Sequence, residues 1–298
     1  MALPSYASPV QRTDYYAYLF FCGVVFFFLV APLIAIVPLS FSVSPFMVFT
    51  DEMLVWPPNP EAWSLRWYQN MIGNCSADVI SSTVPCSTKW MTGTVNSFFI
   101  GFIATFIATT LGTLAALGLS RPHMPYKGLI MAILISPMIV PLIITAAGMF
   151  FFYARINLVY SFTGIILAHV ALATPFVVIT VTATLVGFDM NMVKASQSLG
   201  ARPVRTFFKV IMPLILPGVI SGALFAFITS FDEVVIVMFM GSLDQLTIPK
   251  QMWAGIRQEI SPVILCMATC LVVLSILLLT TVELLRRRSE KLRGITSR

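Results

Sequence analysis

Long runs of apolar residues alternate with short polar segments along almost the whole chain. No charged residue occurs between Tyr15 and Thr50, and a membrane-spanning helix needs only about 20 consecutive apolar residues. Because the hydrocarbon core contains no water to hydrogen-bond the backbone N–H and C=O groups, segments of this length must satisfy these groups internally and are therefore helical. We therefore expect an all-α membrane protein with six transmembrane helices, over about 16–40, 97–119, 128–153, 162–187, 214–240 and 263–285.

Composition agrees with a membrane protein and excludes several other classes. Of 298 residues, 58% are hydrophobic and 10% charged, whereas soluble domains carry about 25% charged residues. This excludes a disordered tail, a disulfide-stapled secreted domain and an ordinary cytosolic enzyme. The net charge is +6, but the basic residues lie in short loops between apolar runs. We therefore attribute them to the topology of the chain in a lipid bilayer rather than to nucleic-acid binding.

Lysine and arginine are distributed unequally between the two sides of the membrane. With six spans both termini lie on one side, which would hold thirteen basic residues: Arg12, Arg121, Lys127, Lys194, Arg202, Arg205, Lys209, Arg286, Arg287, Arg288, Lys291, Arg293 and Arg298. The opposite side would hold five: Arg66, Lys89, Arg155, Lys250 and Arg257. The positive-inside rule therefore predicts that both termini are cytoplasmic.

This topology predicts a single transmembrane domain over 1–298, with an external loop over 43–94. The loop contains four tryptophans, which either anchor it at the membrane interface or belong to a folded external cap that meets a partner: Trp56, Trp63, Trp67 and Trp90. Cys75 and Cys86 lie in the same loop, with ten residues between them, on the oxidising side of the membrane. We predict a disulfide between them.

Motifs for catalysis are missing from the chain. There is no GxxxxGK[ST] phosphate loop, no HExxH and no GxSxG, so we expect no catalytic residue, no metal site and no ATPase site of its own. His169 lies within the fourth span, where we expect it to be hydrogen-bonded to a neighbouring helix. Prolines within the spans predict kinks at Pro137, Pro141, Pro175, Pro213 and Pro217.

The cytoplasmic segment over 188–212 has the pattern of two short helices around a glycine turn. Asp189 or Asn191 is suited to cap the first helix, and Gly200 can adopt the left-handed conformation that ends it. Pro203 fits the first position of the second helix.

The second of these helices places two phenylalanines, Phe207 and Phe208, among Arg202, Arg205 and Lys209. An apolar knob with a basic rim in a cytoplasmic loop suggests docking into another protein. The alternative is that both rings fold back onto the helix bundle.

The spacing within this loop resembles that of permease subunits of bacterial ABC importers, whose loop reads E-A-A, three residues, G, nine residues, I-x-L-P. Lys194, Ala195 and Ser196 stand at the first three positions, Gly200 at the glycine and Pro213 at the proline. The chain departs from the pattern at Lys194, where the family has an acidic residue, and at Ser196. The likeness extends over nearly the whole chain, from Asn96-Ser97 at the second span to 217–235 and 247–262, which look like the polyamine and opine branch, in particular its second permease.

The resemblance implies a type I ABC importer permease (MetI-like) fold in a bacterial inner membrane. It also implies a heteromeric complex with a second permease, two ATPase subunits and an external solute-binding protein, with ATP and Mg²⁺ bound by the ATPases and no cofactor bound by this chain. The loop would couple ATP hydrolysis to transport, and polyamines or related small organic cations would be the solute.

Asp232 and Glu233 are unusual because they lie inside the fifth predicted span. A charged residue at the centre of a span costs about 2.5–3.5 kcal/mol on insertion scales, so such residues usually have a function. We predict that they belong to the translocation pathway, against gating or helix packing. Two rival functions remain, a stand-alone secondary transporter or channel driven by an ion gradient, and a structural membrane subunit.

Overall fold

The computed structural model describes residues 8–56, 59–74, 88–121, 123–186, 188–189, 191–258 and 260–292. Within these ranges the chain consists of helices and their connections, with one isolated bridge between Ser42 and Trp63. Five of the described helices are long and apolar enough to cross a membrane, and the number rises to six if one bent pair counts as a span. The prediction of an all-α membrane protein is confirmed.

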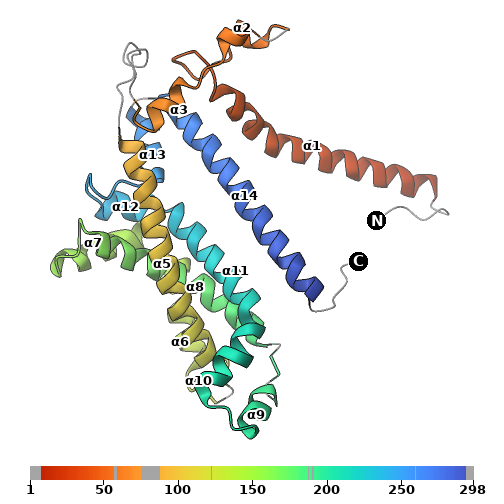
Figure 1. Ribbon diagram of the computed structural model, residues 1–298, viewed down its shortest axis with the longest axis vertical. Helices are drawn as coiled ribbons and strands as arrows, with labels where there is room; N and C mark the ends of the chain where they lie inside the picture. Colours follow the sequence, from red (N-terminus) through yellow and green to blue (C-terminus); the bar gives the residue numbers. More distant parts are fainter. Residues whose placement is uncertain are drawn as a thin grey trace. The chain divides into compact units, whose positions relative to one another are not determined.

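The chain forms two compact units, which we describe separately. The larger unit, residues 89–254, is built around three long helices that lie side by side (Figure 1): α5 (Lys89–Leu119), α8 (Phe162–Val186) and α11 (Met212–Phe231). Its shorter elements are α6 (Lys127–Ile139), α7 (Leu142–Arg155), α9 (Asn191–Ser198), α10 (Pro203–Thr206), the π-helical turn η2 (Phe207–Ile211), α12 (Val235–Met240) and the first part of α13 (Ile248–Gln258).

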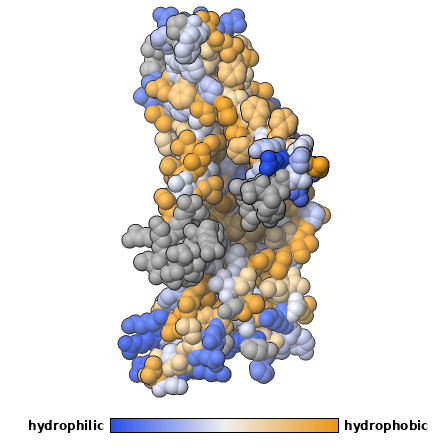
Figure 2. All heavy atoms as spheres, turned by 90° about the vertical axis from the view of Figure 1, so that its right-hand side faces the viewer, coloured by the Kyte–Doolittle hydropathy of each residue, from blue (hydrophilic) through white to orange (hydrophobic). Residues whose placement is uncertain are grey.

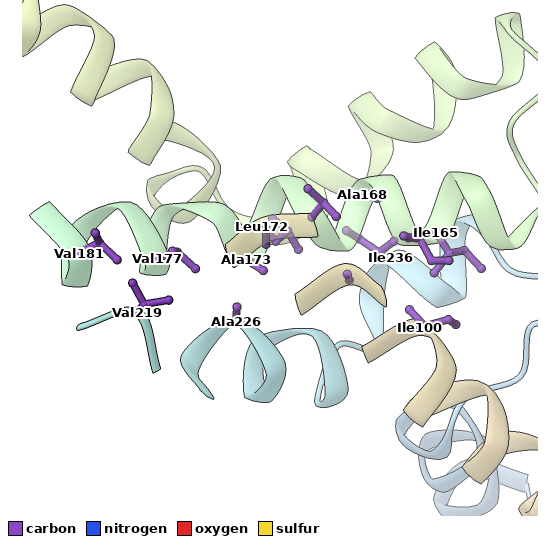
Figure 3. Packing of buried hydrophobic residues seen from close by; sticks show 14 of the residues in the cluster. Ile100, Ile165, Ala168, Leu172, Ala173, Val177, Val181, Val219, Ala226 and Ile236 are labelled. Atoms are coloured by element: carbon purple, nitrogen blue, oxygen red, sulfur yellow. The ribbon is translucent and has the colours of Figure 1, made fainter. Parts of the chain in front are cut away.

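Small residues allow the three long helices to approach one another closely. A Cβ added to Gly112 of α5 would lie 2.6 Å from the Cβ of Val177 in α8, and one added to Gly222 of α11 would lie 3.0 Å from the Cα of Val177. Close packing of this kind drives helix association in lipid, where apolar burial gives little advantage. Figure 3 shows the core along α8, with side chains from three other helices directed towards it: Ile100, Val219, Ala226 and Ile236.

The third predicted span, 128–153, is not one straight helix. It is divided at Val140 and Pro141 into α6 and α7, which are bent by 102° relative to each other. Proline disfavours the helical conformation in the residue before it, and Val140 accordingly is extended, with ψ 135°. The proline signal was therefore correct here, whereas Pro175 and Pro217 lie inside α8 and α11.

The fifth predicted span, 214–240, also has to be corrected. α11 ends at Phe231, and α12 begins only at Val235. The two carboxylates that sequence reasoning placed inside a regular helix, Asp232 and Glu233, therefore lie in the break between two helices.

The other unit, residues 1–88 and 255–298, contains α1 (Pro9–Leu39), α2 (Asp51–Leu54), the 3-10 turn η1 (Pro60–Ala62), α3 (Arg66–Met71) and α14 (Val263–Leu292). Trp67 of α3 is fully buried, and its indole Nε1 donates a hydrogen bond to the carbonyl oxygen of Ser42 at 2.8 Å. The guanidinium of Arg66 lies 4.4 Å from the centroid of the Trp67 ring and donates to the carbonyl oxygen of Val43, and burial lowers the pKa of Arg66.

The tryptophans of the external loop therefore differ in their surroundings. Trp67 and Trp90 are buried, whereas Trp56 is exposed. A folded segment, rather than interfacial anchoring of all four rings, fits this part of the chain. The predicted disulfide partners Cys75 and Cys86 lie outside the described residues, so their pairing stays a prediction.

Candidate functional site

The segment over 188–212 has the two-helix form expected from its sequence. α9 runs over Asn191–Ser198, and the Asp189 carboxylate accepts a hydrogen bond from the backbone N–H of Asn191 at 2.9 Å. Gly200 has φ +79°, the left-handed conformation, and Pro203 begins α10. These local predictions are confirmed, and they follow from turn and cap chemistry alone.

A contact between the two helices fixes the hairpin. The hydroxyl groups of Ser196 in α9 and Thr206 in α10 lie 2.9 Å apart, and Thr206 is buried. Ser196 also donates to the backbone carbonyl of Val193. The serine that departs from the usual second alanine thus has a structural use, because an alanine could not make this contact.

The hairpin presents an apolar surface surrounded by basic residues. Leu199 is 88% exposed, Val204 and Phe208 are largely exposed, and Phe207 is half-buried with its ring 4.9 Å from that of Phe208. The basic residues predicted for its rim are all exposed: Lys194, Arg202, Arg205 and Lys209. Figure 2 shows hydrophilic and hydrophobic atoms adjoining at the lower end of the view, where α9 and α10 lie in Figure 1.

The two rings differ in exposure, so they do not both fold back onto the helix bundle, and docking of this surface into another protein stays a prediction. Phe208 is directed outward, available to another protein, and Phe207 packs back against the chain. Leu199 and Val204 add apolar surface that the sequence pattern did not single out. The sequence did indicate this surface, because apolar residues close to a left-handed glycine in a polar turn have no core in which to be buried.

The two neighbouring carboxylates of the α11–α12 break have different surroundings. Glu233 is only 7% exposed, and its Oε1 accepts a hydrogen bond from the backbone N–H of Ile236 at 2.8 Å, in the first turn of α12. It therefore satisfies a backbone donor that the start of a helix leaves without a partner. Asp232 is exposed, and its backbone N–H donates to Ile228 at the end of α11.

Among the described residues, the Asp232 carboxylate makes no ion pair and no side-chain hydrogen bond. The acidic pair is thus divided into a buried carboxylate that holds a helix end and an exposed one with free acceptor oxygens. Of the two, only Asp232 has its carboxylate exposed and free to meet a positively charged ligand.

The far end of α12 is held by residues that sequence reasoning did not identify. Lys250 Nζ donates to the carbonyl oxygens of Gly241 at 2.8 Å and Ser242 at 3.3 Å, and burial lowers the pKa of this lysine. The Met240 carbonyl accepts from the backbone N–H of Tyr160. α12 therefore has a negative side chain at its N-terminus and a positive one at its C-terminus, as the helix dipole favours.

The start of α5 anchors the segment that leads into α13. Asn96 Nδ2 donates to the carbonyl oxygens of Asp244 and Leu246, at 2.7 and 2.9 Å, and Ser97 Oγ accepts from the backbone N–H of Ile248 at 2.9 Å. The Asn96-Ser97 pair, which was part of the resemblance to the family, thus holds together two segments that are about 150 residues apart in the sequence.

His169 meets the expectation for a lone polar residue in a span. Its Nδ1 lies 2.8 Å from the hydroxyl of Ser230, which joins α8 to the last turn of α11. The contact is fully buried, in keeping with a structural role.

Sequence reasoning also missed an aromatic cluster between α5 and α11. Four phenylalanine rings contact one another there: Phe98, Phe102, Phe227 and Phe231. Their spacing of four residues on each helix was a signal, but 24 phenylalanines in an apolar chain conceal it.

Similar proteins are known for nearly the whole chain. The family described as "Binding-protein-dependent transport system inner membrane component" matches residues 108–291. The spermidine/putrescine transport system permease protein PotC of Haemophilus influenzae is 29% identical over 270 residues, which cover 91% of this chain and 96% of that protein. The putrescine transport system permease protein PotI of Escherichia coli K12 is 28% identical over 269 residues, which cover 88% of this chain and 86% of PotI.

Solved structures show the same fold. A bacterial ABC transporter involved in the import of the acidic polysaccharide alginate contains a chain with a TM-score of 0.69 and 15% identity, covering 96% of this chain and 99% of that one. A chain of the MetNI methionine ABC transporter, in an inward-facing conformation, gives a TM-score of 0.50 and 19% identity over 70% of this chain and 96% of its own length.

Proposed function

The chain belongs to the family of binding-protein-dependent transport system inner membrane components, and we propose that it carries polyamines across the membrane as one permease of an ATP-driven importer. The observation that carries the solute class is the similarity to PotC and PotI over about nine tenths of the chain. The Asp232 carboxylate supports it independently, because it is exposed, has no partner among the described residues, and polyamines are cations.

The proposed complex contains a second permease, two ATPase subunits and an external solute-binding protein. ATP and Mg²⁺ are bound by the ATPases, and this chain binds no cofactor. Both termini lie in the cytoplasm, as the distribution of basic residues favours. The hairpin over 188–212 is then on the ATPase side of the membrane.

The hairpin transmits the motion of the ATPases to the helix bundle. Its exposed apolar residues enter a groove on an ATPase, and the basic rim contacts acidic residues around that groove. Because α10 continues through η2 directly into α11, a displacement of the hairpin moves α11 as well. Differential binding of the two ATPase states to the hairpin biases the bundle between outward-facing and inward-facing conformations.

Lys194 stands where the family pattern has an acidic residue. In this proposal it pairs with an acidic residue of the ATPase, or leaves the contact to the hairpin of the second permease. Asp232 attracts the solute within the pathway, and Glu233 holds the start of α12.

The test is uptake of radiolabelled putrescine and spermidine by cells from which only the gene for this chain is deleted and then restored. We expect uptake to disappear on deletion and return on restoration, and to stop when ATP is depleted while ion gradients are maintained. Uptake that continues without ATP would favour the ion-gradient transporter, and uptake that survives the deletion would favour a structural subunit.

A further inference from the structure

The aromatic cluster between α5 and α11 is built around a glycine. A Cβ added to Gly101 would lie 3.1 Å from Cε2 of Phe227 and 3.8 Å from Cδ2 of Phe231. Phe98 and Phe102 lie on either side of this glycine in α5. The glycine therefore lets the α11 rings lie against the α5 backbone, in contact with both α5 rings.

The four rings form one continuous surface. Phe231 lies 5.1 Å from Phe98 and 5.3 Å from Phe227, and Phe227 lies 5.2 Å from Phe102, all measured between ring centroids. None of the four rings is fully buried, and Phe102 is 61% exposed. The cluster thus offers aromatic surface to a ligand and is not simply part of the buried core.

The exposed carboxylate adjoins this surface along the chain. Asp232 directly follows Phe231, so their Cα atoms are about 3.8 Å apart. Its backbone N–H still bonds to Ile228, which keeps it on the last turn of α11. The end of α11 that carries Phe231 therefore also carries an exposed negative charge, whereas the four rings themselves carry no hydrogen-bonding group.

These features select a particular chemistry. A carboxylate beside phenyl rings suits an organic ammonium ion, because an aromatic face attracts a cation within about 6 Å of its centroid. The rings also provide apolar contact for methylene groups, while neither the phenyl rings nor the carboxylate offers a positive charge or a hydrogen-bond donor to an anion. An alkyl diamine or triamine combines ammonium groups with methylene spacers.

We propose that Phe98, Phe102, Phe227 and Phe231, together with Asp232, form a binding subsite for the ammonium and methylene groups of an alkyl polyamine on its way through the permease. This inference rests on the proposed function and adds the residues that recognise the solute. The rings are specificity-determining: they bind the solute weakly and without directional hydrogen bonds, so it can leave.

The test is equilibrium binding of radiolabelled spermidine to the purified permease–ATPase complex without the solute-binding protein. The double variant Phe102→Leu/Phe227→Leu keeps apolar bulk but removes two aromatic faces, and we expect its Kd to rise about fivefold. Phe102→Tyr/Phe227→Tyr keeps the faces and should bind like the wild type. The matched control is Phe106→Leu, a residue of α5 that is 74% exposed and contacts no other ring among the described residues.

The outcomes separate this site from the proposed function. Spermidine binding by the wild type that is unchanged in the leucine variant would overturn the subsite and leave the polyamine function standing. No spermidine binding or uptake by the wild-type complex would overturn both. Loss of the second permease from the purified leucine variant would identify the rings as a subunit interface and overturn the subsite.

Discussion

Asp232 and Glu233 are neighbours in sequence, yet at the scale of single residues their side chains have different surroundings. Glu233 accepts a hydrogen bond from Ile236 at the start of α12, and it is buried. Asp232 is exposed, with free acceptor oxygens within the described part of the chain. The sequence predicted that the pair is functional but could not divide the roles, because the break in the helix was not foreseen.

The different surroundings of the two carboxylates predict different results for two amide substitutions. Asp232→Asn removes the negative charge and should lower putrescine uptake about tenfold, the loss expected for one charged hydrogen bond. Glu233→Gln keeps an oxygen that can accept from Ile236, so uptake should stay near the wild-type level. Uptake rates at equal amounts of assembled complex are the measurement, and a Glu233→Gln defect larger than that of Asp232→Asn would contradict the assignment.

The predicted disulfide between Cys75 and Cys86 is a second test at the scale of single residues. If Cys75 and Cys86 are bonded, closing a loop of this size should stabilise the chain by about 3 kcal/mol in the chain-entropy model. Mass spectrometry of peptides from the unreduced, membrane-extracted protein should show the linked pair. Free thiols at both positions would refute it and weaken the assignment of this loop to the external side.

At the scale of elements, close approaches through glycine hold the long helices together. Gly112→Val should destabilise the protein strongly, since its side chain would overlap Val177 of α8. Gly118→Val, in the same helix but with nothing within 4 Å, is the matched control and should be tolerated. Thermal melting of the detergent-solubilised protein measures both, and equal melting temperatures would show that the α5–α8 contact is not tight.

The turn between α9 and α10 offers a second test at this scale. Gly200→Val places a β-branched residue at φ +79° and should re-aim α10, with loss of solute-stimulated ATP hydrolysis. Gly200→Asn should retain much of the activity, because asparagine tolerates the left-handed conformation. Full stimulation in the valine variant would mean that the turn does not transmit the motion.

The accuracy of the sequence predictions differs between these elements for physical reasons. The hairpin was predicted well because Asp189, Gly200 and Pro203 act through local backbone chemistry. The long apolar helices were predicted because their length is set by the bilayer. The break at Asp232 was missed because the apolar run resumes at Val234, so the run kept the length of a single span across the two carboxylates. The partners that hold α12, Lys250 and Tyr160, come from distant segments.

At the scale of the whole molecule, one continuous helical element joins the hairpin to the residues proposed to bind the solute. α10, η2 and α11 follow one another without a break from Pro203 to Phe231. The hairpin lies at one end of this element and the aromatic cluster with Asp232 at the other. Under the proposed function, movement imposed by an ATPase at the hairpin would act directly on the residues proposed to bind the solute.

The most direct test of this coupling is putrescine transport by the complete complex reconstituted in proteoliposomes. ATP is supplied on the ATPase side and the solute-binding protein on the other side, without any ion gradient. We expect transport that requires both ATP and the binding protein, survives a protonophore and disappears in Gly200→Val. Transport that proceeds without ATP down an imposed ion gradient, or that is unaffected by Gly200→Val, would contradict it.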